Sequence, residues 1–225
     1  AMEGGGVPPT IRLQDGSYMP VLAYGTYHVH DAAAVRAAYA AGFRHFDCAQ
    51  FYGNESVVGE ALYGMAPRED LFITSKLWND SHRPELVRTA CERTLRDLGV
   101  GYLDLYLIHW PVAWRPGTSN VLDPKVSLAD TWRAMEALVE EGLVRAIGVS
   151  NFGPADLEEV LAGCRVRPSV NQIELHPFHA QRGLVGWCRR RGVHVAAYRP
   201  LGEGKLGDLL AHPAVAAAAA AAGAG

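Results

Sequence analysis

The chain alternates apolar segments of strand length with helical patterns, and this alternation constrains the fold more than any other feature of the sequence. Seven strand candidates occupy residues 22–26, 43–47, 71–75, 102–108, 144–149, 169–173 and 193–198. Helical patterns lie between them, at residues 31–41, 54–63, 84–98, 127–141, 154–163 and 181–190. Repeated strand–helix units with short connections predict a parallel sheet covered by helices.

Two architectures contain such a sheet, an open doubly wound sheet and a closed barrel. The open sheet needs a glycine-rich loop after its first strand, and residues 25–31 (GTYHVHD) do not provide it. Residues 202–207 (GEGKLG) have the spacing GxGxxG, but no acidic residue follows about 20 positions later to bind a ribose. We therefore expect an α/β fold of the (β/α)8 TIM-barrel type, incomplete because only seven strands are recognisable.

The two ends of the chain differ from this repeating pattern. Residues 10–21 contain two short extended runs around Asp15-Gly16, which is a two-residue hairpin signal. We expect a disordered segment over residues 1–9, the hairpin and barrel domain over residues 10–213, and a low-complexity, alanine-rich tail over residues 214–225. Alanine favours a helix, so the tail can be helical, but it does not specify an eighth strand.

Composition excludes several classes of function. Of the 225 residues, 49% are apolar and 20% are charged, and the net charge is -3. This balance indicates one large globular domain, without the basic stripe of a nucleic-acid-binding protein or the apolar run of a membrane span. The first residues lack the charged and apolar regions of a signal peptide. We expect a cytoplasmic monomer with no nucleic-acid or membrane partner.

The four cysteines, Cys48, Cys91, Cys164 and Cys188, lie far apart in the sequence. They form no CxxC pair of the kind that binds a metal or exchanges disulfides. We interpret them as free thiols that fill the core.

Ionisable residues stand at the carboxyl ends of three consecutive predicted strands. Asp47, Lys76 and His109 occupy these ends, and Tyr52 follows Asp47 in the next loop. Because the carboxyl ends of barrel strands meet on one face, we expect the four side chains to lie close together. Each alone has an ordinary explanation: packing for the tyrosine, solvation for the lysine and burial for the histidine. The combination favours a catalytic cluster, in which no metal is expected.

A carbonyl that accepts a hydride becomes an alkoxide, and these four side chains suit that change. Tyr52 can donate the proton, although a phenol normally has a pKa of about 10. A neighbouring Lys76 ammonium favours the phenolate, so we expect it to lower the pKa of Tyr52. Asp47 would keep Lys76 charged and oriented, and His109 would direct an N–H at the carbonyl oxygen.

Seven stretches of the chain carry a family resemblance. They are GTY at 25–27, GFRHFDCAQFYGNE at 42–55, SKLW at 75–78, LDLYLIHWP at 103–111, GLVRAIGVSNF at 142–152, NQIELHPF at 171–178 and AYRPLG at 197–202. In this order and spacing they resemble the aldo-keto reductase family, in the form of a plant-like NADPH-dependent aldehyde or ketone reductase. In that family the four residues above form a catalytic tetrad, and the resemblance implies the same tetrad here.

The resemblance also implies a site for NADP(H) and a pocket for a small-molecule carbonyl substrate. Ser150, Asn151 and Gln172 would bind the nicotinamide carboxamide, and Tyr198 would stack on the nicotinamide ring. The ribose and diphosphate would lie against Gly25, Thr26, Pro200, Leu201 and Gly202, and Asp47 would also take part in cofactor binding. Aromatic side chains would form the walls of the substrate pocket, namely Tyr27, Trp78 and Trp110, and His109 would also contact the substrate.

The sequence departs from the family pattern in two places. The family's AYSPLG is AYRPLG here, with Arg199 where a small residue is common. The segments of the eighth strand, including the Lys, Ser and Arg that bind the 2′-phosphate of NADP, are not recognisable, so we expect a barrel truncated before that strand. The leading hypothesis is NADPH-dependent reduction of aldehydes and ketones. The alternative is a truncated, inactive or regulatory nucleotide-binding homologue.

Overall fold

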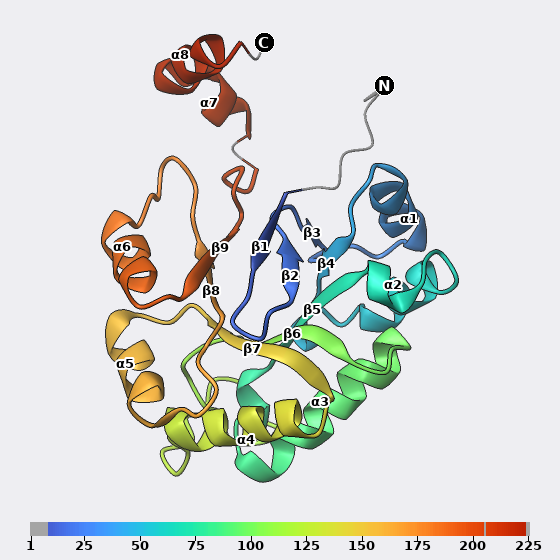
Figure 1. The fold of residues 1–225 in the computed structure, drawn as a ribbon, viewed down its shortest axis with the longest axis vertical. Helices are drawn as coiled ribbons and strands as arrows, with labels where there is room; N and C mark the ends of the chain where they lie inside the picture. Colours follow the sequence, from blue (N-terminus) through green and yellow to red (C-terminus); the bar gives the residue numbers. More distant parts are fainter. Residues whose placement is uncertain (1–8, 205, 224–225) are drawn as a thin grey trace.

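Seven parallel strands form one sheet in sequence order, and the sheet curves into a nearly closed barrel (Figure 1). The structure is a computed structural model that describes residues 9–204 and 206–223. Residues 1–8, expected to be disordered, lie outside the described part. The strands are β3 (Tyr24–Gly25), β4 (His45–Asp47), β5 (Phe72–Leu77), β6 (Leu103–Ile108), β7 (Val144–Ser150), β8 (Val170–Glu174) and β9 (His194–Tyr198).

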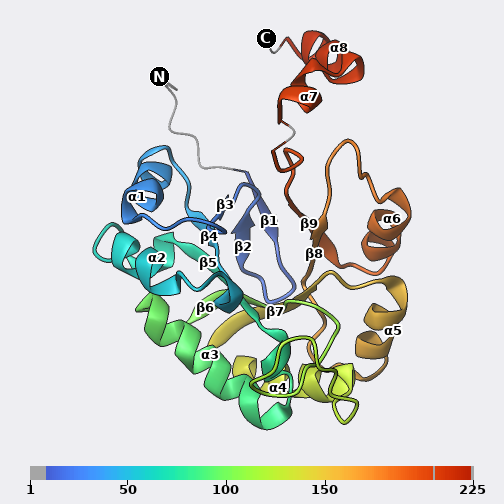
Figure 2. The same ribbon diagram turned by 180° about the vertical axis from the view of Figure 1, so that it is seen from behind.

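Six helices alternate with these strands and cover the outside of the sheet (Figures 1 and 2). They are α1 (Ala32–Ala40), α2 (Glu55–Leu62), α3 (Pro84–Leu98), α4 (Leu128–Glu140), α5 (Pro154–Gly163) and α6 (Arg182–Arg190). Local chemistry sets their ends: Asp31 accepts a hydrogen bond from the backbone N–H of Ala33 at the start of α1. Pro84 occupies the first turn of α3, and Gly99 ends this helix at a φ of 65°. The predicted strands and helices are all present, with ends within two residues of those expected.

The strands bury side chains on both faces. Their outward side chains pack against the helices in one large apolar core that includes Phe46, Tyr106 and Trp132. Their inward side chains form a second, smaller cluster inside the barrel that includes Phe72, Leu105 and Leu107. Burial on both faces explains why the strands are nearly continuous apolar runs in the sequence.

The antiparallel hairpin of β1 (Thr10–Arg12) and β2 (Tyr18–Pro20) joins the inner cluster. Its Leu13 and Met19 are buried with the inward side chains of the barrel. Five residues separate the two strands, so the expected two-residue turn at Asp15-Gly16 is wrong. The Leu13 N–H donates to the Ser17 carbonyl oxygen at 2.8 Å, and the Gly16 N–H donates to the Leu13 carbonyl oxygen at 3.1 Å, so the turn is centred on Gln14 and Asp15. Asp15 also accepts hydrogen bonds from the Ser17 hydroxyl and backbone N–H.

The hairpin lies between the two edge strands of the sheet in both views (Figures 1 and 2). It contacts both sides of this opening: Nδ1 of His45 on β4 lies 3.1 Å from the Pro20 carbonyl oxygen, and Nε2 of His194 on β9 lies 3.2 Å from that of Arg12. Among the described residues, β3 and β9 form the edges, and no eighth barrel strand joins them. An edge strand presents unpaired backbone groups.

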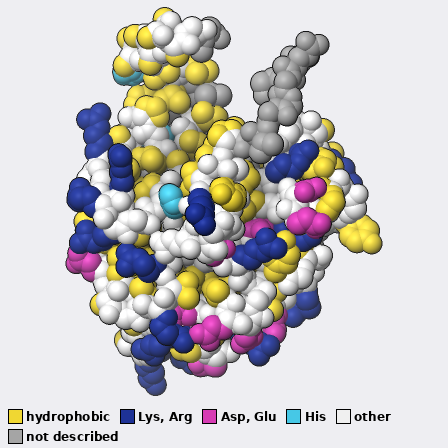
Figure 3. All heavy atoms as spheres, in the orientation of Figure 1, with side chains coloured by type: hydrophobic (Ala, Val, Ile, Leu, Met, Phe, Trp, Pro, Cys, Tyr) yellow, Lys and Arg dark blue, Asp and Glu magenta, His cyan; other side chains and the backbone are white. Residues whose placement is uncertain are grey.

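Two helices follow β9 and stand apart from the barrel (Figure 1). α7 (Leu206–Ala211) was not predicted from the sequence, whereas α8 (Pro213–Ala221) confirms that the alanine-rich tail can be helical. Apolar side chains are prominent on this lobe in the space-filling view (Figure 3). The described part of the chain also contains three short 3-10 helices: η1 (Gln50–Tyr52), η2 (Arg68–Asp70) and η3 (Asn79–Ser81).

Candidate active site

Lys76 lies at the centre of the predicted cluster. Its ammonium donates hydrogen bonds to Asp47 Oδ1, to the Cys48 carbonyl oxygen at 2.9 Å and to the Tyr52 hydroxyl at 3.2 Å. Lys76 is fully buried, although lysine is rarely so. The register of β4 and β5 and the η1 helix after β4 place these groups together. The structure therefore brings Asp47, Tyr52 and Lys76 into direct contact.

Asp47 is engaged on both of its carboxylate oxygens. Lys76 contacts Oδ1, and Nε2 of Gln172 donates a 2.6 Å hydrogen bond to Oδ2. Burial by itself lowers the pKa of Lys76, but Asp47 and Tyr52 outweigh it, so the pKa is raised above that of an ordinary lysine. Lys76 is thus a permanent cation next to the Tyr52 hydroxyl.

The pKa of Tyr52 differs from the expectation. Burial raises it, and the Lys76 ammonium lowers it by less, so the pKa of Tyr52 is raised above that of a free phenol. Lys76 does lower the pKa of Tyr52, as expected, but the expected net lowering of this pKa is wrong. The expectation left out the free-energy cost of burying a phenolate. Tyr52 is therefore a protonated phenol, which is the form that can donate a proton.

His109 completes the cluster at the end of β6. Its ring centroid lies 6.1 Å from that of Tyr52 in an edge-on arrangement, and 5.0 Å from that of Trp78. Burial, assisted by the Lys76 ammonium, lowers the pKa of His109 to about 3. The imidazole is therefore neutral at physiological pH, with one N–H donor.

The residues assigned to the nicotinamide form a hydrogen-bonded chain at the ends of β7, β8 and β9. Ser150 Oγ donates to the Gln172 carbonyl oxygen at 2.9 Å, and Asn151 Nδ2 donates to the His109 carbonyl oxygen at 3.0 Å. The Tyr198 hydroxyl donates to Asn151 Oδ1 at 2.9 Å. Asn151 has a φ of 63°, a conformation that asparagine tolerates better than most residues.

Gly25 and Thr26 border the other side of the cluster. Gly25 pairs with Asp47 in the sheet, and the Thr26 hydroxyl donates to the Asp47 carbonyl oxygen at 3.0 Å. Sequence reasoning did not single out Asn54, whose Nδ2 donates 2.7 Å hydrogen bonds to the carbonyl oxygens of Thr26 and Val29. Asn54 thereby ties the segment that contains Tyr52 to the loop after β3.

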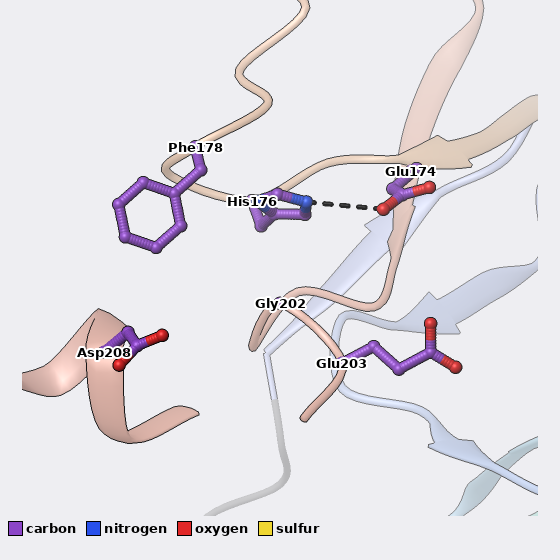
Figure 4. A pocket seen from close by; sticks show the side chains of 6 residues that line it. All are labelled: Glu174, His176, Phe178, Gly202, Glu203 and Asp208. Carbon is purple, nitrogen blue, oxygen red and sulfur yellow. Dashed lines mark hydrogen bonds and ion pairs between the residues drawn. The ribbon is translucent and has the colours of Figure 1, made fainter. Parts of the chain in front are cut away.

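Pro200, Leu201 and Gly202 form the turn that follows β9. The turn is closed by a 2.9 Å hydrogen bond from the Gly202 N–H to the Arg199 carbonyl oxygen. Beside it lies a cavity of about 460 Å³, lined by Glu174, His176, Phe178, Gly202, Glu203 and Asp208 (Figure 4). Within this cavity His176 Nε2 lies 3.4 Å from Glu174 Oε1.

Two of the aromatic side chains that the resemblance assigns to a substrate pocket lie beside the cluster. Tyr27 lies 5.0 Å from Tyr52 between ring centroids, and Trp78 lies next to His109. A second cavity of about 310 Å³ is lined by Trp78, Asn79, Trp110, Val112 and Trp114.

Two further aromatic residues contact Trp78 and were not predicted. Phe51 stacks on it at 4.0 Å, and Trp114 meets it edge-on at 5.4 Å. The position of Phe51 next to Tyr52 could have revealed it, whereas Trp114 lies in a long loop with no local signal.

The described residues contain no group of three or more His, Cys, Asp and Glu side chains arranged to hold a metal ion. Within the same part of the chain, no helix combines the length and the hydropathy needed to cross a membrane. The four cysteines are free thiols, three of them buried.

Comparison with known proteins identifies the family. The sequence profile described as "Aldo/keto reductase family" matches residues 22–211, which contain the whole cluster. This chain belongs to the aldo/keto reductase family. Among solved structures, this aldo/keto reductase is similar to the "Aldose Reductase from Schistosoma japonicum", with a TM-score of 0.87, 43% identity, and coverage of 94% of this chain and 74% of the other.

Similar curated proteins include "Aldo-keto reductase family 1 member A1" from Bos taurus and from Sus scrofa, at 45% and 46% identity over 210 residues. Each match covers 86% of this chain and 65% of the relative. "Aldose reductase C" from Dictyostelium discoideum is 43% identical over 216 residues, covering 86% of this chain and 67% of the relative. The chain thus spans just under two thirds of the length of the mammalian relatives.

Proposed function

We propose that this chain carries the reductase site of an NADPH-dependent enzyme that converts aldehydes and ketones to alcohols, with Tyr52 as the proton donor. One observation carries the proposal: the buried Lys76 ammonium contacts both the Asp47 carboxylate and the Tyr52 hydroxyl. A solvated lysine or a tyrosine that serves only in packing needs no such arrangement. Burying an ion pair carries a desolvation penalty, and buried charged groups of this kind cluster at functional sites. The names of the similar proteins support reductase chemistry.

The residues next to this cluster fit a nicotinamide dinucleotide. Ser150, Asn151 and Gln172 are buried or half-buried hydroxyl and carboxamide side chains at adjacent strand ends, which suits an amide ligand. Gln172 also contacts Asp47, so this ligand would lie beside the catalytic cluster. When bound, the cofactor supplies a hydride to the carbonyl carbon.

The chain's own residues then have three tasks. The Tyr52 hydroxyl donates its proton to the developing alkoxide, and the neutral His109 donates an N–H hydrogen bond that holds the same oxygen. As the proton leaves, Lys76 stabilises the resulting phenolate across 3.2 Å, and Asp47 keeps Lys76 oriented. The aromatic walls exclude water and suit apolar or aromatic carbonyl compounds.

The decisive experiment is oxidation of NADPH by the purified chain in the presence of a simple aromatic aldehyde, followed at the NADPH absorbance band. Alcohol formation in equal amount supports the proposal. NADPH binding without turnover would instead favour a regulatory nucleotide-binding homologue. Absence of both binding and turnover would refute each of these functions for the 225-residue chain.

A further inference from the structure

Glu55 is a buried carboxylate that the proposed reaction does not use. It lies in the first turn of α2, and only 4% of its surface is exposed. Ser75 Oγ on β5 donates a 2.6 Å hydrogen bond to Glu55 Oε1, and Thr94 Oγ1 on α3 donates a 3.1 Å hydrogen bond to Oε2. The two hydroxyls lower the pKa of Glu55, but burial raises it by more, so the pKa is above that of an ordinary glutamate. Glu55 therefore joins three elements at a cost in desolvation.

The bond from Ser75 lies directly behind the contact between Lys76 and Tyr52. Side chains alternate along a strand, so Lys76 points into the barrel, where it contacts Tyr52, and Ser75 points outward to the helices. The segment that contains Tyr52 and Glu55 is thus joined twice to the same two neighbouring residues of β5. The contact of Lys76 with Tyr52 is 3.2 Å long, at the upper end of the hydrogen-bond range, so a small displacement would break it.

Tyr52 depends on anchors further along the chain. Phe51 and Gly53, on either side of it, are exposed, whereas Asn54 and Glu55 are buried. The segment follows β4, which lies between β3 and β5 in the sheet. Asn54 ties the segment to the loop after β3. Glu55 is the corresponding anchor on the side of β5.

A glycine lets α2 lie close enough to α3 and β5 for these bonds. Gly59 lies one turn after Glu55, and α2 and α3 lie side by side on the outside of the sheet (Figures 1 and 2). A Cβ atom at Gly59 would lie 2.5 Å from the carbonyl oxygen of Leu98 on α3, so a larger residue does not fit at the present separation. The close packing of the two backbones therefore helps to place Glu55.

We propose that Glu55 is a positioning residue that holds Tyr52 against Lys76, through its hydrogen bond to Ser75 rather than through its charge. The inference rests on the proposed function for the part that the contact between Tyr52 and Lys76 plays in proton transfer. A glutamine has the same shape as Glu55 and can accept a hydrogen bond from Ser75 while donating one to Thr94. It should therefore replace Glu55, whereas a leucine should not.

The first test separates kcat from binding. Glu55→Leu should lower kcat for an aromatic aldehyde by on the order of 10- to 100-fold, because misplacing a reacting group by about 1 Å can cost as much. KM and NADPH affinity should remain close to those of the unmodified chain, and Glu55→Gln should retain most of the kcat. Ser75→Ala removes a single hydroxyl and should lower kcat in the same direction, so it provides the test if Glu55→Leu does not fold.

Glu136→Leu is the matched control. Glu136 is a fully buried glutamate on α4, and its carboxylate accepts hydrogen bonds from the backbone N–H groups of Arg165 and Val166. These two residues precede β8, at the end of the barrel opposite to the strand ends that carry the site. Urea denaturation should show a loss of stability in this variant, whereas kcat should be normal.

The second test needs no turnover. A 3,5-difluorotyrosine at position 52 ionises at a lower pH than tyrosine, and fluorine NMR gives the pKa of its phenol. Lys76→Met should raise this pKa, because the ammonium favours the phenolate, and the size of the rise measures the contact. Ser75→Ala should reduce the rise to about half or less, because the Coulomb energy falls with distance and hydration. Glu55→Gln should leave the rise unchanged.

Any of three kinetic results would overturn the inference. Equal losses of kcat in Glu55→Gln and Glu55→Leu would show that the charge acts, and not the hydrogen bond. Normal kcat in a folded Glu55→Leu or in Ser75→Ala would show that the bond does not position Tyr52. An equal loss in Glu136→Leu would show that the losses reflect destabilisation alone.

Failure of the proposed function gives a different result. If the unmodified chain does not reduce the aldehyde, the proposed function is refuted, and the comparison of pKa values decides the inference about Glu55. A smaller effect of Lys76→Met in the Ser75→Ala background then supports the inference, and an undiminished effect overturns it.

Discussion

Gln172 on β8 donates a 2.6 Å hydrogen bond to the Asp47 carboxylate on β4, across the barrel and 125 positions along the chain. The bond joins the side chain assigned to the nicotinamide to the ion pair that contacts Tyr52. It also leaves Asp47 with both oxygens occupied, one by Gln172 and one by Lys76. The orientation of the proposed acid–base cluster therefore depends on the part of the barrel that would bind the cofactor.

The first prediction concerns the proton donor. Tyr52→Phe should reduce kcat by roughly 10²–10⁴, the usual contribution of a general acid, because it removes the hydroxyl that contacts Lys76. NADPH affinity should stay unchanged, as measured by fluorescence titration. Tyr39→Phe is a control outside the site, on α1, and should have normal turnover. Near-normal kcat in Tyr52→Phe would remove Tyr52 from the mechanism.

The second prediction concerns the buried ion pair. Lys76→Met should abolish turnover while NADPH binding survives, because Lys76 acts on Tyr52 rather than on the cofactor. It should also lower the free energy of unfolding by about 3–5 kcal/mol, since it leaves the Asp47 carboxylate buried without its cation. Urea denaturation measures this loss.

The double variant Lys76→Met/Asp47→Asn provides the matched comparison. Removing the uncompensated carboxylate should restore part of the lost stability without restoring turnover. If Lys76→Met loses cofactor affinity but retains turnover at saturation, the assigned role of Lys76 is wrong. If the double variant is less stable than Lys76→Met, the uncompensated charge is not the cause of the loss.

The third prediction concerns acid sensitivity. His82 is buried, neither of its ring nitrogens has a hydrogen-bond partner among the described residues, and burial lowers its pKa to about 4. Between pH 6.5 and 4, His82 is protonated in the unfolded chain and neutral in the folded chain. The free energy of unfolding therefore falls as the pH is lowered. Between pH 7 and pH 5, His82 alone should lower the free energy of unfolding by about 2 kcal/mol.

His82→Leu should remove this part of the pH dependence, because an apolar side chain has no proton to take up. Urea denaturation at pH 7 and at pH 5 measures it, with His30→Gln, an exposed histidine, as the control. The stability of the control should change with pH as in the unmodified protein. An equally steep loss in His82→Leu would show that His82 is not responsible.

The fourth prediction concerns the choice of dinucleotide. The resemblance attributes recognition of the 2′-phosphate to a Lys, Ser and Arg segment that is not recognisable in these 225 residues. The loss of two charge-assisted hydrogen bonds of about 1.5–3 kcal/mol each should weaken NADPH binding by roughly 10²-fold or more, relative to a family member that has this segment. Fluorescence titration should give similar dissociation constants for NADPH and NADH. Tight, low-micromolar binding with strong preference for NADPH would contradict the prediction.

Local patterns in the sequence determined the order of elements and the meeting of the four tetrad residues. The strands are buried on both faces, so each is a continuous apolar run that can be recognised by itself. Once seven such runs alternate with helices, Asp47, Lys76 and His109 must converge, because parallel barrel strands end on one face. The helix ends at Asp31, Pro84 and Gly99 depend on local cap residues, so the sequence predicts them directly.

Only the tertiary structure decided the features that depend on burial and on contacts across the barrel. The net pKa of Tyr52 is raised because packing excludes water from the phenol, a cost that the sequence does not display. The Gln172–Asp47 bond, the contact of Trp114 with Trp78, and the carboxylate partners of Arg199 join residues from separate elements. Sequence spacing predicts which strand ends share a face, but the distances between side chains on that face follow from the curvature of the sheet and the packing of its loops.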